Sequence, residues 1–316
     1  MTRRTARWTA ALACALAIGA AGSCHKPPSA ETRSYYMGRT GLSDAAALGC
    51  FNADKSGRLT LFFGAPTAVG GGYGATLWGA PDLTVDQIGA RVRNVVRGFA
   101  YCRSNASHLL LIGVGTSNSG INGRTDAWLR AHGDAWARMV RSLAIWVERE
   151  YRGYARITAA WDFEPSWSTF AKAEQWMHGY DAHPGRRLLY ANASADGCPT
   201  ASATNGACNN GWNQRRVWHL AWEHDPSLPI PQIYRTDGIQ ARQWQLIDLW
   251  ATTAVGDGMY FYGTMSQHGA CRQVGGCAGI DNTPHKAYDQ LLWWLNSDRR
   301  TAQADIETMT DVNWNT

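Results

Sequence analysis

The most informative segment of the sequence is Ile157-Thr158-Ala159-Ala160-Trp161-Asp162-Phe163-Glu164. Its side chains change character at the two-residue period of a β-strand. The face that carries Ile157, Trp161 and Phe163 is large and apolar, whereas the other face is small or acidic. The first face suits packing against outer helices, and the second suits the inside of a barrel. We therefore predict a strand over residues 157–163 that helices cover on one side.

Helical patterns lie on both sides of this strand. Residues 125–151 carry apolar side chains at helical spacing, and residues near 170–178 follow the same pattern. Further out, the sequence predicts strands at 59–63, 109–114, 188–191, 217–222, 230–234 and 259–264, and helices at 85–102, 239–253 and 284–296. This alternation predicts an α/β protein, a (β/α)8-type barrel that is irregular in its second half, and leaves the eighth strand unplaced.

The composition fits one large soluble domain. The chain has 316 residues, of which 45% are hydrophobic and 17% charged, and this apolar fraction excludes a disordered chain. After residue 30 no apolar run approaches the roughly 18–20 residues that span a membrane. We assign residues 46–298 to a single barrel domain and residues 299–316 to a polar tail.

The N-terminus has the features of an export signal. Three arginines precede the small, apolar residues 9–21, so residues 1–23 are predicted to form a signal peptide. The stretch Ala21-Gly22-Ser23-Cys24 resembles a bacterial lipobox, which implies lipidation of Cys24 and a tether over residues 24–45. An ordinary secretion signal that is cut near the same place is the alternative. Both predict an exported protein, either anchored to the outer face of the cytoplasmic membrane or secreted.

The charge balance argues against nucleic acid as a partner. The net charge is +5 for the whole chain, and without Arg3, Arg4 and Arg7 it falls to +2, with 27 basic and 25 acidic residues. No Lys/Arg cluster replaces these arginines. We expect a monomer that contacts the membrane only through its lipid.

The cysteine count also suits an oxidising compartment. Apart from Cys14 and Cys24, six cysteines remain, an even number that allows 15 pairings. Short loops suggest two pairs, and elimination leaves the third: Cys198 with Cys208, Cys271 with Cys277, and Cys50 with Cys102.

The candidate catalytic residues lie at the end of the strand predicted for residues 157–163. Asp162 and Glu164 share its inner face, roughly 6–7 Å apart at Cα. Like charges and partial burial can raise the pKa of one carboxyl group while the other stays ionised, which is the requirement for acid/base catalysis. The alternative is structural, because acids at strand ends also cap helices or pair with arginine.

Other predicted strand ends carry polar and aromatic side chains. Glu223 follows residues 217–222 and is our candidate for a further carboxylate. Aromatic rings stack on sugars and amides bind hydroxyl groups, so we expect a substrate-binding wall, although the strand period places Trp161 on the helix side. The expected wall consists of Trp161, Trp167, Trp222, Gln232, Tyr234 and Tyr262.

Several of these stretches resemble a known family. Asp162-Phe163-Glu164 resembles the D-x-E strand of the family 25 (lysozyme-type) glycoside hydrolases and related glycoside-hydrolase-like TIM barrels. Leu188–Asn192 and Val217–Trp222 are similar to two later strands of that family, which no helix separates. The resemblance implies that Glu164 is the general acid and Asp162 its partner. The chain departs from the family at Gly64-Ala65-Pro66, where the first strand of the family ends near an Asp.

We therefore expect an exported glycoside hydrolase that cleaves a cell-wall or other glycan by carboxylate acid/base catalysis, without a metal or another cofactor. The first alternative is a non-catalytic surface lipoprotein that binds carbohydrate or an envelope partner. The second is a metal-dependent hydrolase that uses Asp162, Glu164, Glu223 and His224.

Overall fold

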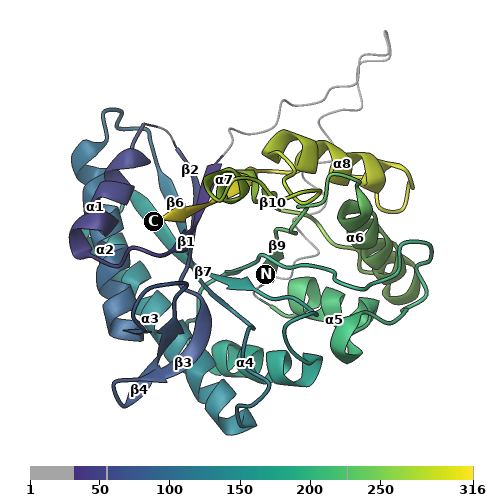
Figure 1. Ribbon diagram of the computed structural model, residues 1–316, viewed down its shortest axis with the longest axis horizontal. Helices are drawn as coiled ribbons and strands as arrows, with labels where there is room; N and C mark the ends of the chain where they lie inside the picture. The colour runs from purple at the N-terminus through teal and green to yellow at the C-terminus, as the bar shows by residue number, and fades with distance from the viewer. Residues whose placement is uncertain (1–31, 55, 226, 316) are drawn as a thin grey trace.

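The computed structural model describes residues 32–54, 56–225 and 227–315, and its centre is a curled, eight-stranded parallel sheet (Figure 1). Each strand pairs with its neighbour in parallel. In spatial order the strands are β10 (Thr264–Ser266), β11 (Met309–Asn315), β1 (Thr32–Met37), β2 (Gly57–Phe62), β6 (Leu110–Ser117), β7 (Ala155–Asp162), β8 (Leu189–Ala191) and β9 (Ser227–Pro229).

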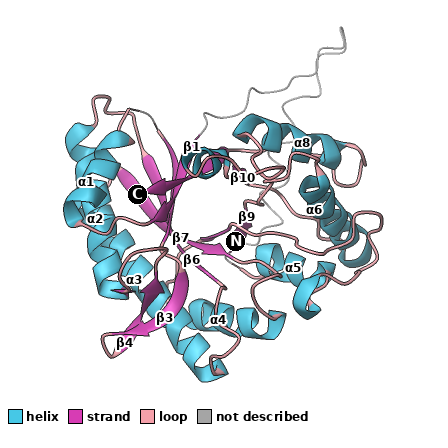
Figure 2. Cartoon of the chain, viewed as in Figure 1, coloured by secondary structure: helices cyan, strands magenta, loops and turns pink. Residues whose placement is uncertain are grey.

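Helices surround the outer side of this sheet (Figure 2). The capping box of Thr84 and Gln87 starts α2, and the Thr125 and Thr283 side chains accept backbone hydrogen bonds at the starts of α3 and α8. The helices are α1 (Leu42–Phe51), α2 (Val85–Cys102), α3 (Asp126–Glu150), α4 (Phe170–Ala182), α5 (Gln214–Trp218), α6 (Ile239–Trp250), α7 (His268–Gln273) and α8 (Pro284–Asn296).

Backbone hydrogen bonds also join the two ends of the strand order. Beyond β9, the chain runs beside the segment that leads into β10. The Met265 amide donates to the Pro231 carbonyl at 2.9 Å, and the Ile233 amide donates to the Met265 carbonyl at 2.8 Å. Gln232 and Met265 form a parallel bridge. The strand β10 therefore has backbone contacts with the segment that follows β9.

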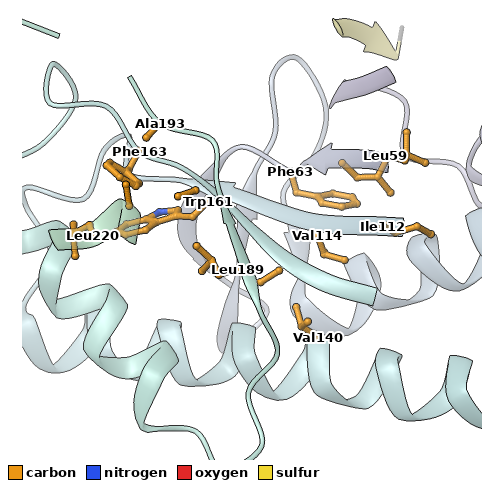
Figure 3. Close-up of a cluster of buried hydrophobic side chains, with 14 of the residues drawn as sticks. Leu59, Phe63, Ile112, Val114, Val140, Trp161, Phe163, Leu189, Ala193 and Leu220 are labelled. Atoms are coloured by element: carbon orange, nitrogen blue, oxygen red, sulfur yellow. The ribbon is translucent and has the colours of Figure 1, made fainter. Parts of the chain in front are cut away.

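The sheet is packed on both faces. On the outer face, apolar side chains of β2, β6 and β7 meet the helices (Figure 3). Trp161 stacks on Trp176 of α4, with ring centroids 4.7 Å apart. The inner face holds a smaller cluster made of Phe62, Ala160, Tyr190, Ile230, Tyr234, Met265 and Val312. The alternation predicted for residues 157–163 is confirmed, because Trp161 faces the helices and Ala160 faces inward.

The inner face leaves little room beside β6. A Cβ atom on Gly113 would lie 3.0 Å from Cδ2 of Tyr190 and 3.2 Å from Cβ of Ala160. Glycine at position 113 thus lets the Tyr190 ring fill the centre of the curled sheet.

Two predicted boundaries are wrong. Thr32–Met37 lies in the range assigned to a tether, and Met309–Asn315 lies in the range assigned to a polar tail, yet they form the adjacent strands β1 and β11. Both are strands that the sequence analysis did not predict. A short antiparallel sheet of β3 (Ala65–Val69), β4 (Gly72–Thr76) and β5 (Leu83–Thr84) also lies between the predicted strand at 59–63 and the predicted helix at 85–102, where no strand was expected.

The predicted strand over residues 217–222 is wrong as well. This segment is helical and comprises the end of α5 and the π-helical turn η3 (His219–Glu223). Asn213 caps it by accepting from the Arg216 amide at 2.9 Å. Val217, Trp218, Leu220, Ala221 and Trp222 are all buried, so the segment lacks the polar face that would have revealed its helical period.

The three suggested disulfides are confirmed: Cys50–Cys102, Cys198–Cys208 and Cys271–Cys277. They are consistent with an oxidising, exported environment. Within the described ranges, no helix has the length and apolar character needed to cross a membrane. The predicted signal peptide and Cys24 lie outside the described residues.

Candidate functional site

The candidate site begins at the C-terminal end of β7, where the strand period turns Asp162 and Glu164 inward. Asp162 is fully buried, and the Gln232 side chain donates to its Oδ1 at 2.6 Å. The same Gln232 amide donates to the Asn192 carbonyl at 3.3 Å. Gln232 follows β9 and Asn192 follows β8, so side chains and backbone from three strand ends meet here.

The backbone of Glu164 is held from β6. The Asn118 side chain donates to the Glu164 carbonyl at 3.0 Å and accepts from the Glu164 amide at 2.9 Å. These two hydrogen bonds form a clamp that continues the pairing of β6 with β7 beyond Ser117 and Asp162, the last paired residues of the two strands. The side chain of Glu164, which is partly exposed, therefore starts from a rigid backbone position.

A third carboxyl group, Asp196, completes the cluster. Asp196 and Gln232 both lie near enough to the Glu164 carboxyl group to affect its pKa, which Asp196 raises and Gln232 lowers. Asp196 lies in the loop after β8 and is partly exposed. Sequence reasoning missed it, because Asp196 lies in a turn beyond the end of β8, where the strand period no longer applies.

The environment raises the pKa of both Asp162 and Glu164. Burial, followed by the charges of Asp162 and Asp196, raises the pKa of Glu164 to about 9. Burial likewise raises the pKa of Asp162 well above its usual range, against the hydrogen bond from Gln232. Oδ2 of Asp162 has no hydrogen-bond partner in the described part of the chain. At neutral pH Glu164 is therefore a neutral acid that can donate a proton.

Two tyrosines lie beside the acids. The hydroxyl groups of Tyr36, on β1, and Tyr234 are 3.5 Å apart. Burial, with the charge of Asp162 as a further cause, raises the pKa of both phenols. Both hydroxyl groups therefore remain protonated hydrogen-bonding groups near the carboxyl groups.

An aromatic cluster extends from Tyr36 to the rim. Trp78 follows the β3–β4 hairpin, and Trp314 is near the end of β11. The Tyr36 ring lies 4.8 Å from Trp78 and 4.8 Å from Trp314, centroid to centroid. Both tryptophans are partly exposed. The sequence analysis did not select either residue, because their positions depend on a hairpin and a strand that it did not predict.

The structure brings part of the predicted wall to this place. Gln232 and Tyr234 belong to the site, and Trp167 lies in its loop, where the Trp167 amide donates to the Glu164 carbonyl at 3.1 Å. Trp161 is buried against α4 on the opposite face of the sheet. Trp222 is buried and donates to Oδ2 of Asp257 at 3.2 Å, so it does not line the site.

Glu223 and Tyr262 lie at the other end of the strands. Glu223 ends η3, just before β9 begins, and accepts from His219 at 2.6 Å. The Tyr262 carbonyl accepts from Arg58, the second residue of β2. Glu223 was expected at a strand end, but the helical conformation of residues 217–222 places it at the N-terminal edge of the sheet, away from Asp162.

The structure does not bring together the four residues that the metal-dependent alternative requires as ligands. Glu223 and the neighbouring His224 come before the start of β9, whereas Asp162 and Glu164 lie at the C-terminal end of β7. Among residues 32–54, 56–225 and 227–315, no group of three or more His, Cys, Asp or Glu side chains is arranged to hold a metal ion.

Comparison of the chain with protein-family models, with curated proteins and with solved structures returns no match. The assignment of function therefore depends on the geometry of the acid cluster and on the aromatic rim.

Proposed function

We propose that this chain is an exported glycoside hydrolase in which Glu164 is the general acid. The observation that carries the proposal is the state of Glu164: a partly exposed carboxyl group, held by a rigid clamp, with its pKa raised to about 9. A glycosidic oxygen is a poor leaving group until it is protonated, and a neutral carboxylic acid is what protonates it in glycosidases.

The residues around Glu164 suit a sugar. Trp78 and Trp314 offer apolar ring faces to the C–H surface of a pyranose, while the hydroxyl groups of Tyr36 and Tyr234 offer hydrogen bonds to its hydroxyls. We also infer that the contacts between Gln232 and Met265 close the sheet as a (β/α)8 barrel. In that fold the C-terminal ends of the strands form the active-site mouth, where these residues lie.

The reaction would proceed by proton transfer from Glu164. Its carboxyl proton passes to the glycosidic oxygen, the bond from that oxygen to the anomeric carbon breaks, and the leaving sugar departs as an alcohol. Water then adds its hydroxyl to the anomeric carbon and returns a proton to the Glu164 carboxylate. Asp162 is fully buried and cannot touch the sugar in this conformation, so it acts on Glu164 rather than on the substrate.

One observation favours a second candidate function, a surface protein that binds glycan without cleaving it. Asp162, the carboxyl group that shares the strand with Glu164, is fully buried, whereas glycosidases use two carboxyl groups that both reach the scissile bond. Hydrolysis by such a pair would require Asp162 to become accessible when substrate enters.

The test is release of reducing ends from peptidoglycan and from defined oligosaccharides. We expect Glu164→Gln to lower the rate by about 10²-fold or more, the usual contribution of a general acid. Glu223→Gln is the matched control, because it removes an exposed carboxylate at the opposite end of the strands. A wild-type protein that binds glycan but releases no reducing ends would establish the binding function instead.

A membrane anchor at Cys24 belongs to the same proposal. Mass spectrometry of the protein from the membrane fraction would show a diacylglyceryl-modified Cys24 if the lipobox is processed. An N-terminus without lipid would indicate secretion.

A further inference from the structure

A histidine on α3 joins two helices to the small antiparallel sheet. His132 is fully buried, and the Trp176 indole of α4 donates to its Nδ1 at 2.9 Å. An indole nitrogen can only donate, so Nδ1 carries no proton and the ring proton is on Nε2. Nε2 therefore donates to the Gly74 carbonyl of β4, 2.8 Å away. One neutral tautomer thus satisfies both ring nitrogens and links α3, α4 and β4.

A protonated ring does not fit this arrangement. A proton on Nδ1 would face the Trp176 N–H group across 2.9 Å, which places two donors at hydrogen-bond distance. The imidazole is stacked on Trp136, with an interplanar angle of 15°. To separate the two donors the ring must turn out of this stack, and turning moves Nε2 away from the Gly74 carbonyl.

The groups around His132 also disfavour a positive charge. From β4 the Tyr73 phenol ring faces the imidazole, with centroids 5.8 Å apart, and α4 contributes the neutral indole described above. The charged neighbour is Arg124, which precedes α3 and has the same sign as a protonated ring. Burial, with the charge of Arg124 as a smaller cause, lowers the pKa of His132 to about 4, against the hydrogen bond to Gly74.

The bond to Gly74 is the second attachment of the β3–β4 hairpin. The first is at its base, where the Gly64 carbonyl accepts from the Thr116 hydroxyl at 2.8 Å and from the Ser117 amide at 2.9 Å. His132 holds the opposite strand of the hairpin, β4. The chain continues from β4 to Trp78, which is part of the aromatic rim.

We propose that His132 is a positioning residue that holds the β3–β4 hairpin, and with it Trp78, in place only while its ring is neutral. Acid therefore releases the hairpin from α3 and α4. The attachment of the hairpin is independent of the proposed function. Only the consequence for glycan binding rests on that function.

His132 differs from the other histidines that form ring hydrogen bonds in the described part of the chain. Each of those bonds to an oxygen through Nδ1, so a protonated ring can still donate there; they are His108, His183, His219 and His268. The Nδ1 partner of His132 is an N–H group instead. Among these rings, His132 is therefore the one whose Nδ1 bond acid would break.

The first measurement is NMR of the full chain with ¹⁵N-labelled histidine, with His132→Gln used to assign the His132 signals. We expect the Nε2–H tautomer and a titration midpoint near 4. Trp176→Phe removes the donor to Nδ1 and should raise this midpoint by about one unit or more toward the ordinary value. Trp218→Phe is the matched control, because it removes another buried indole donor, one that bonds to the Asp257 carbonyl, and should leave the midpoint unchanged.

The second measurement is amide hydrogen exchange of residues 65–78, compared at pH 4 and pH 6.5. The reference at each pH is His132→Gln, because glutamine offers one acceptor and one donor group and does not titrate. At pH 4 the wild type should exchange about tenfold faster than this variant, the effect of losing one hydrogen bond. At pH 6.5 the two proteins should exchange alike.

The outcomes separate this inference from the proposed function. A midpoint near 6.5, an Nδ1–H tautomer, or hairpin exchange that does not respond to protonation would overturn the role of His132. Exchange that rises equally in β6 and β7 would mean global unfolding and would also overturn it. If the NMR and exchange results are as expected but calorimetry finds no glycan binding at either pH, the role of His132 stands and the proposed function fails.

Discussion

The raised pKa of Glu164 predicts that this acid lowers the stability of the folded protein at neutral pH. Its pKa is about 9 in the folded state against an ordinary value of 4.5. The folded state therefore binds this proton more tightly than the unfolded state does. The resulting stabilisation is fully present below pH 4.5 and is lost progressively as the pH rises toward 9.

The magnitude follows from the shift. Between pH 4.5 and pH 7 the loss approaches 2.5 pH units at 1.36 kcal/mol each, or about 3 kcal/mol. Because Glu164 is partly exposed to solvent, this figure is an upper limit. Glu164→Gln replaces the acid with a neutral side chain of the same shape, so it should remove this loss. The variant and the wild type should be equally stable near pH 4.5, and the variant should be more stable at pH 7.

The assay is equilibrium unfolding in guanidinium chloride, with the disulfides intact, at half-unit intervals from pH 4.5 to pH 8. The quantity to plot is the free energy of unfolding of Glu164→Gln minus that of the wild type. We expect this difference to grow with pH to between 1 and about 3 kcal/mol at pH 7. Glu223→Gln reports the effect of losing one exposed carboxylate. A difference that stays flat, or that favours the wild type at pH 7, would refute the claim that Glu164 is held protonated.

Two further predictions concern the rim and the interior. Trp78→Ala and Trp314→Ala should each weaken glycan binding measured by calorimetry by about tenfold, because each removes one ring face that could stack on sugar; unchanged dissociation constants would show that the sugar does not bind at this cluster. Gly113→Val should lower the free energy of unfolding by about 1–3 kcal/mol or more, because its side chain would meet Tyr190 and Ala160 inside the curled sheet; full stability would mean that the interior has spare room beside β6.

The sequence predicted the outer helices of this fold better than the strands that complete its sheet. Helices such as α3 and α8 have one apolar face and one polar face, and their bounds could be read from that period. The strands β1 and β11 have no such signal. Each contains polar residues that face the sheet interior, and is stable because it pairs with the other across 278 residues of sequence. Pairing at that distance leaves no local pattern in a single sequence.

In the acid cluster too, the sequence predicted what depends on neighbouring residues and missed what depends on distant ones. The two-residue period of β7 was sufficient to place Asp162 and Glu164 on the inner face and Trp161 on the outer one. It could not indicate that Asp162 would be sealed from solvent, because that depends on Gln232 arriving from beyond β9. Asp196 lies in a turn beyond β8, in a loop that the Cys198–Cys208 disulfide closes, so the strand period could not place it near Glu164. The raised pKa of Glu164 therefore depends on groups that follow three different strands, β7, β8 and β9.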